Sequence, residues 1–271
     1  MKIVKLYIRL MKKIWPLLLF YVLSFGVIVV GLYFFRESGY LEAVEVDSEY
    51  RKLPVIKQVF MGNINDFQCY MNTLSFLLVM AIVSGCGFFL QIIHDSGISR
   101  RSRMLPISEN RLSFQIILAN LLYTLIMDVF FILAGLILFG YPELGVSVLW
   151  FSLNTVVFSL TMIAVSYLVS LVAQKKDSVF LFSILYAGIS CCTGGFFIPQ
   201  GHFTEGAIRL AEFTPSYWFV RCNAVLTASV KIGTTFLSET GKCLLMECFW
   251  AIAFLALAIA LEKERHRKDL Y

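Results

Sequence analysis

Long apolar stretches, separated by shorter polar segments, run through almost the whole chain. A membrane span needs about 20 mostly apolar residues. Five stretches meet that length clearly, and a sixth does so although it contains Glu247. No internal repeat or linker divides them. The pattern therefore predicts an all-α integral membrane protein, one domain over residues 1–271, with six transmembrane helices at residues 14–35, 70–93, 113–140, 147–172, 179–198 and 241–261.

Composition supports a membrane protein. Hydrophobic residues make up 59% of the chain and charged residues 15%, with a mean hydropathy of +0.78. The core of one soluble domain cannot bury that much apolar surface, so lipid must cover the excess. Residues 217–230 are too short for a seventh span and carry Arg221 and Asn223.

The basic residues orient the six spans. With both termini in the cytoplasm, 15 of the 23 Lys and Arg residues lie inside, although the outer segments are longer. This bias agrees with the positive-inside rule. A seventh span would leave the basic C-terminal tail outside. The inner set is Lys2, Lys5, Arg9, Lys12, Lys13, Arg100, Arg101, Arg103, Arg111, Lys175, Lys176, Lys263, Arg265, Arg267 and Lys268.

Residues 1–13 place their five basic side chains on one stripe at helical pitch. Such a stripe predicts an N-terminal amphipathic helix that lies in the headgroup plane, with its cations near anionic lipid. An ordinary basic flank of the first span explains the same residues equally well.

The first long inner connection, residues 94–112, contains a segment that fits a short helix along the inner face, at about residues 95–104. Leu105-Pro106 ends it, because proline disfavours helix in the residue before it. Arg100, Arg101 and Arg103 would suit an acidic partner or lipid phosphates. The positive-inside bias alone would also place three arginines here.

The stretch before the last span is broken. Gly194 and Gly195 allow close approach and bending, and Pro199 stops the helix. A short helix fits residues 204–213, and Thr214-Pro215 offers a cap and a first-turn proline for another. Broken backbone near a membrane survives only where protein or a wet cavity satisfies it. We therefore predict an outer re-entrant helical hairpin, residues 199–230, which closes a pathway and whose aromatic side chains suit an interfacial depth; its gate residues are Gly194, Gly195, Phe197, Pro199, Pro215 and Tyr217.

Two carboxylates fall inside the predicted spans. Asp128 lies near the middle of the third span, where an ionisable group is a functional candidate by default. A structural role is the favoured interpretation: Ser159 or Thr161, at similar depth on the antiparallel fourth span, would satisfy it by a hydrogen bond. Glu247 lies nearer the outer end of the last span, where it would reach water.

Motifs for chemistry are not found in the sequence. Thr240-Gly241-Lys242-Cys243 lacks the earlier glycine and the final Ser or Thr of a phosphate loop. The three histidines are scattered, and the seven cysteines form no CxxC pair. We therefore expect no catalytic site, no cofactor and no metal in this chain, and no binding of nucleic acid.

The order of these parts resembles the membrane subunit of type-2 ABC transporters, the ABC-2 permease family of bacterial exporters. The resemblance covers essentially the whole chain. Its most specific points are Gly97, Leu105-Pro106-Ile107-Ser108, Gly195-Phe196-Phe197-Ile198-Pro199 and Pro215-Ser216-Tyr217. At His94-Asp95 the chain departs from the family, whose members often carry Glu and a longer polar run.

The resemblance implies a multi-pass subunit of the bacterial plasma membrane that works as a homodimer or heterodimer of permeases. Two cytosolic ABC ATPase subunits would bind ATP and Mg. The inner helix would be the coupling helix that docks on them, through Asp95, Gly97, Arg100, Arg101, Arg103 and Pro106. The hairpin would gate an outward exit for a hydrophobic or amphiphilic cargo, a drug or an antimicrobial peptide.

Two other functions fit the same spans. A proton-coupled secondary transporter or channel would use Asp128, with Glu247 as a second group. A passive immunity or receptor protein of the membrane would bind a peptide without moving it.

Overall fold

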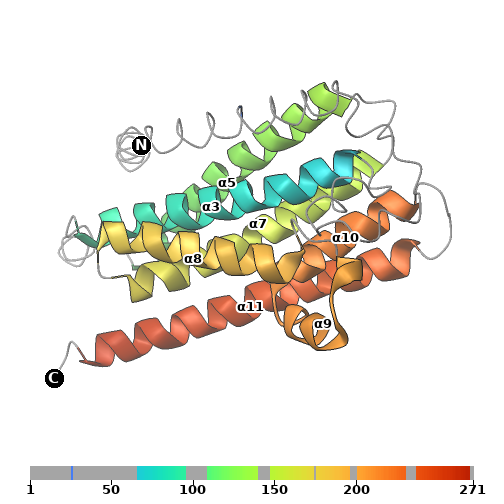
Figure 1. Cartoon of the computed structure of the whole chain (residues 1–271). Helices are drawn as coiled ribbons and strands as arrows, with labels where there is room; N and C mark the ends of the chain where they lie inside the picture. The colour runs from blue at the N-terminus through green and yellow to red at the C-terminus, as the bar shows by residue number, and fades with distance from the viewer. Residues whose placement is uncertain are drawn as a thin grey trace.

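The structure is a computed structural model that describes Gly26 and residues 66–95, 109–139, 147–173, 175–195, 200–229 and 236–268. Within these residues it is all-helical and contains no strand. Figure 1 shows the long helices lying side by side in one bundle.

Five of the described helices are long and apolar enough to cross a membrane. They coincide with five of the six predicted spans, which confirms a multi-pass helical membrane architecture. The first predicted span, residues 14–35, lies outside the described residues except for the helical Gly26, as do residues 1–13. The five helices are α3 (Asp66–Asp95), α5 (Glu109–Phe139), α7 (Ser147–Val172), α8 (Lys176–Gly194) and α11 (Phe236–Lys268).

The end of α8 differs from the prediction. We expected the span to continue to residue 198, but the helix ends at Gly194. Gly195 caps it in the left-handed conformation, with φ 81° and ψ 31°. Only glycine adopts this conformation without steric cost, so Gly195 fixes the end of the helix ahead of Pro199.

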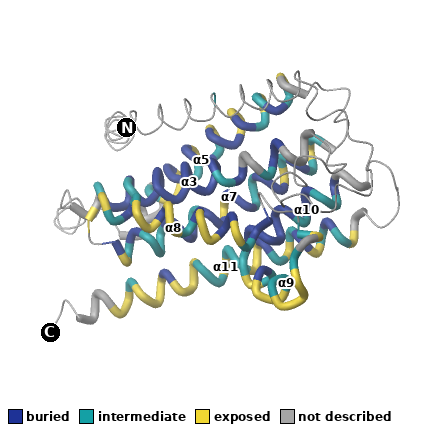
Figure 2. Tube along the Cα trace, viewed as in Figure 1, coloured by how far each residue is buried: buried dark blue, intermediate teal, exposed yellow. Residues whose placement is uncertain are grey.

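Helix α3 occupies the centre of the bundle and packs against α5, α7 and α8. Figure 2 shows its trace almost wholly buried. Small residues near Gly85 permit this close packing. A Cβ at Gly85 would overlap the ring of Tyr123 on α5, and one at Gly87 would lie 2.8 Å from Val179 Cγ1 on α8.

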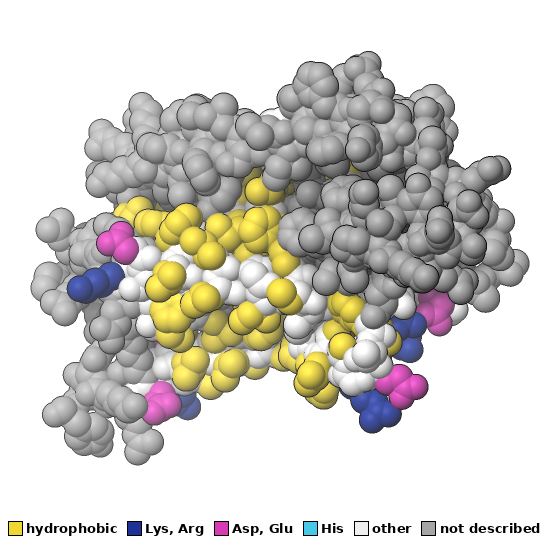
Figure 3. Space-filling model, in the orientation of Figure 1, with side chains coloured by type: hydrophobic (Ala, Val, Ile, Leu, Met, Phe, Trp, Pro, Cys, Tyr) yellow, Lys and Arg dark blue, Asp and Glu magenta, His cyan; other side chains and the backbone are white. Residues whose placement is uncertain are grey.

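Helices α5, α8 and α11 carry large apolar side chains on their outer faces. In the face seen in Figure 3, hydrophobic side chains cover the middle of the molecule, and the described Lys, Arg, Asp and Glu side chains lie toward its two ends. An apolar belt between charged ends is the surface that a bilayer covers.

Candidate functional site at the junction of α7, α10 and α11

The chain between α8 and α11 forms three short elements: η2 (Gln200–His202), α9 (Glu205–Ala211) and α10 (Pro215–Ser229). Thr204 caps α9, since its Oγ1 accepts a hydrogen bond from Ala207 N at 3.4 Å. Helix α9 ends two residues before the predicted residue 213, and α10 begins at Pro215 as the sequence predicts. In Figure 1, α9 projects from the side of the bundle while α10 lies within it.

Gln200 joins the end of α8 to the start of α10. Its Nε2 donates to Gly194 O at 2.9 Å and to Tyr217 O at 2.8 Å. The last carbonyls of a helix have no partner within that helix, so one amide here satisfies an open helix end and ties it to the next helix. Sequence reasoning missed this residue; the only signal was an amide side chain directly after Pro199.

The aromatic side chains of helix α10 pack inside the protein. Tyr217, Trp218 and Phe219 are all buried, whereas Phe213, before the helix, is exposed. Contacts on several sides explain the burial: Trp218 Nε1 donates to Glu212 O at 2.9 Å, and the Phe219 ring stacks on Phe158 of α7 at 4.3 Å.

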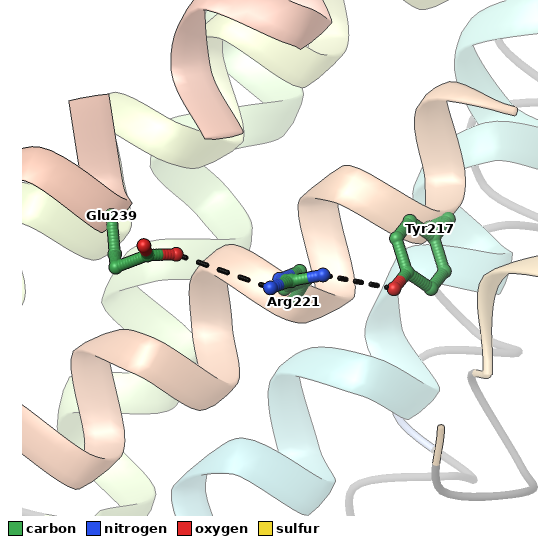
Figure 4. Close-up of polar contacts among 3 residues, drawn as sticks. All are labelled: Tyr217, Arg221 and Glu239. Atoms are coloured by element: carbon green, nitrogen blue, oxygen red, sulfur yellow. Dashed lines mark hydrogen bonds and ion pairs between the residues drawn. The ribbon is translucent and has the colours of Figure 1, made fainter. Parts of the chain in front are cut away.

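A polar contact links α10 to the first turns of α11 (Figure 4). Arg221 Nη1 donates to Tyr217 Oη at 3.1 Å, and Arg221 Nη2 lies 3.9 Å from Glu239 Oε2. Partial burial works against the charge of Arg221, but the hydrogen bond to Tyr217 and the neighbouring Glu239 raise its pKa above the ordinary value. The side chains of Arg221 and Glu239 are 36% and 45% exposed, so solvent weakens this ion pair.

The buried face of α11 is mainly polar. Among its described side chains, those classed as buried are Thr240, Cys243, Glu247 and Ala258. Glu247 is 0% exposed, and neither carboxylate oxygen has a hydrogen-bond partner. The prediction that Glu247 reaches water is therefore wrong: α11 begins at Phe236, five residues before the predicted span, and turns Glu247 toward α7 and α10.

Side chains of α7 and α10 surround this part of α11. Thr161 Oγ1 donates to Glu247 O at 3.2 Å. Two turns before Thr161 on α7, Asn154 Nδ2 donates to Asn223 Oδ1 at 2.9 Å and to Phe219 O at 3.2 Å. Cys222 of α10 and Cys243 of α11 are both buried in this region. We call the buried set Asn154, Thr161, Cys222, Asn223, Cys243 and Glu247 the polar junction.

Asp128 is buried on α5, and Ser159 Oγ donates to its Oδ1 at 2.7 Å. This confirms the hydrogen bond that the sequence predicts from Ser159. Thr161, the other expected partner, bonds to Glu247 O instead. Ser159 and Thr161 are two positions apart on α7, so they point to opposite sides of that helix. Asp128 and Glu247 therefore contact different faces of α7 and do not form one site.

The remaining predicted site residues are placed as follows. Gly194 and Gly195 end α8, and Pro215 and Tyr217 lie in the first turn of α10. Asp95 is the last residue of α3, so it does not begin a separate inner helix. The described part of the chain does not include Gly97, Arg100, Arg101, Arg103, Pro106, Phe197 and Pro199.

Comparisons of the chain with protein-family models, with curated proteins and with solved structures find no match. Within the described residues, no group of three or more His, Cys, Asp or Glu is arranged to hold a metal ion.

Proposed function

We propose that the chain is the membrane-spanning permease subunit of an ATP-driven ABC exporter in a bacterial plasma membrane. The observation that carries the proposal is a buried, non-spanning α10 packed inside a bundle of membrane-length helices, directly before the last of them. This helix order is the one by which the sequence resembles type-2 ABC permeases. In this proposal the cargo is hydrophobic or amphiphilic and moves outward.

We propose further that α9 and α10 form an outer re-entrant hairpin that gates the exit. A helix of 15 residues is about 22 Å long, short of the roughly 30 Å hydrocarbon core. Its polar backbone ends therefore need partners within the protein. Two side-chain hydrogen bonds fix the hairpin to its neighbours: Gln200 donates to Tyr217 O in the first turn of α10, and Trp218 of α10 donates to Glu212 O at the end of α9.

ATP and Mg would be bound by separate cytosolic ATPase subunits, and the working unit would be a homodimer or heterodimer of permeases. The coupling segment in this proposal is residues 96–104, with Arg100, Arg101 and Arg103 as the groups that dock on the ATPase. Because Asp95 belongs to α3, this segment starts directly at the inner end of the central helix.

Charge reversal at these three arginines tests the proposal. The chain is co-expressed with candidate ABC ATPase subunits from its own organism, and the three arginines are replaced together by Glu. We expect the ATPase to be lost from the purified complex while the permease remains folded. Reversal of Lys263, Arg265 and Arg267 is the matched control, since it changes the same charge on the same side of the membrane. Equal recovery of the ATPase with both variants would contradict the coupling role.

The buried Asp128 favours one competing function, a proton-coupled secondary transporter or channel. Its Oδ2 has no hydrogen-bond partner, whereas its Oδ1 accepts from Ser159. That function requires transport by the purified chain alone in liposomes, and the transport must be lost in Asp128→Asn. Transport that needs the ATPase and survives in this variant would exclude it.

A further inference from the structure

We propose that Glu247 is the anionic centre of an internal binding site for an organic cation, at the polar junction of α7, α10 and α11. The proposal rests on the proposed export function in one respect: the bound cation would be the head group of an amphiphilic cargo. The binding itself does not depend on an ATPase.

The first reason is the state of Glu247. Its side chain is 0% exposed, and within the part of the chain that the structure describes neither carboxylate oxygen has a hydrogen-bond partner. An ionised carboxylate removed from water is very costly unless another group pairs with it. In a membrane span such a residue marks a functional site by default. Asp128, by contrast, has Ser159 as a donor.

The second reason is that the surrounding helices offer no balancing charge. Helix α7 contains no charged residue, and the only one on α10 is Arg221. Arg221 bonds to Tyr217 and lies against Glu239, two turns of α11 before Glu247. On α11 itself, Lys242 is exposed. The positive charge that would pair with Glu247 therefore comes from a ligand.

The third reason is the kind of acceptor present. Among the described residues, the buried Asn154 Oδ1 has no hydrogen-bond partner. Thr161 bonds to Glu247 O, and one turn before Thr161 the ring of Phe158 stacks on that of Phe219. A hard divalent cation needs six or more oxygen ligands, more than this set supplies. A single buried carboxylate, with aromatic rings one turn away on α7, instead suits a monovalent ammonium or phosphonium group with apolar substituents.

Access to Glu247 requires α11 to part from α10. The first turn of α11 is joined to the middle of α10 by the half-exposed pair of Arg221 and Glu239 at 3.9 Å, and the buried Cys222 and Cys243 follow directly on the two helices. Most of the α11 surface already faces outward (Figure 2). Separation of these contacts would open the junction to a ligand from the outer-leaflet side.

The test is equilibrium binding of radiolabelled tetraphenylphosphonium to the full chain in nanodiscs of phosphatidylcholine. We expect saturable binding by the wild type, at least tenfold weaker binding by Glu247→Gln, and retained binding by Glu247→Asp. Glu262→Gln is the matched control, since Glu262 lies on the same helix and bonds to Tyr167 at its inner end. Absence of saturable binding by the wild type, or equal binding by Glu247→Gln, would overturn the proposal.

Competition on the wild type gives a second readout that requires no variant to fold. Dodecyltrimethylammonium is expected to displace the probe, and dodecyl sulfate of the same chain length is not; displacement by both, or by neither, contradicts a cation site. Different results would overturn the cation site and the exporter function. ATP-coupled export that is undiminished in Glu247→Gln overturns the site alone, whereas cation binding without any ATP-coupled export overturns the exporter and leaves the site.

Discussion

Helices α3 and α11 are both apolar and long enough to cross the membrane, yet they have opposite places in the bundle. In its most apolar window α3 is 81% buried inside the protein, whereas α11 is only 11% buried. The buried side chains of α3 are mostly apolar, and those of α11 include Thr240, Cys243 and Glu247. The central helix is thus held by close packing over its length, and the peripheral helix by a narrow polar stripe. In our account α3 keeps its position in the bundle, and α11 moves away from α10.

The largest effect is expected from truncating a central side chain. Leu78→Ala on α3, where the leucine is 1% exposed, should lower the free energy of unfolding by about 3 kcal/mol through lost packing. Leu245→Ala on α11, where the leucine is 71% exposed, should change it by less than about 0.5 kcal/mol. Unfolding in mixed micelles with increasing dodecyl sulfate measures both. Equal losses of unfolding free energy in the two variants would contradict the distinction between a tightly packed α3 and a peripheral α11.

A second prediction concerns the close approach of α3 to α5. Gly85→Ala should destabilise the chain by about 2 kcal/mol, because its methyl group overlaps the Tyr123 ring. That ring cannot simply withdraw, since Tyr123 Oη donates to Ala81 O at 3.0 Å. Gly188→Ala on α8 is the control, as nothing lies within 4 Å of its added Cβ. Thermal unfolding followed by circular dichroism compares the two; a neutral Gly85→Ala would show that the α3–α5 contact can relax.

A third prediction sharpens the role of the link between α8 and α10. Gln200→Glu keeps the shape of the side chain but places a carboxylate against the carbonyls of Gly194 and Tyr217. We expect a local loss of about 1–3 kcal/mol for the two hydrogen bonds. Hydrogen exchange should show faster exchange in α10 than in the wild type, with α3 unchanged. Faster exchange in α3 as well would mean that the link supports the whole bundle.

The smallest loss of stability is expected from breaking the ion pair between Arg221 and Glu239. Arg221→Ala should cost less than about 1 kcal/mol, because the pair with Glu239 is partly exposed and screened. If the pair holds the junction closed, the variant should change the association rate of tetraphenylphosphonium clearly while its melting temperature changes little. The melting temperature and the association rate of the probe, measured on the same preparation, test this. An unchanged association rate would leave the pair without a gating role.

The sequence predicted the helices well and their positions in the bundle poorly. Apolar length is a local property, so the five described spans could be located to within seven residues of the observed helix ends, the largest difference being at the end of α11. The place of a helix in the bundle is not local: lipid tails and a protein interior are similarly apolar, and hydropathy does not distinguish a central α3 from a peripheral α11.

Polar residues show the same limit. Depth along two antiparallel spans predicted Ser159 or Thr161 as the partner of Asp128, and only the structure shows that it is Ser159. Glu247 was misplaced for two reasons. Its depth along the span depends on where α11 begins. Its burial depends on packing against α10, a short helix whose position in the bundle no sequence pattern indicates. Gln200 was missed for a related reason: its two acceptors come from helix ends that only the tertiary fold brings together.

The most direct test of ATP-driven export uses inside-out proteoliposomes that contain the chain with the ABC ATPase that co-purifies with it, and tetraphenylphosphonium as the transported probe. We predict uptake of the probe on addition of ATP and Mg, none with the chain alone, and none when ATP cannot be hydrolysed. Uptake by the chain alone, driven by a pH gradient and lost in Asp128→Asn, would contradict the account.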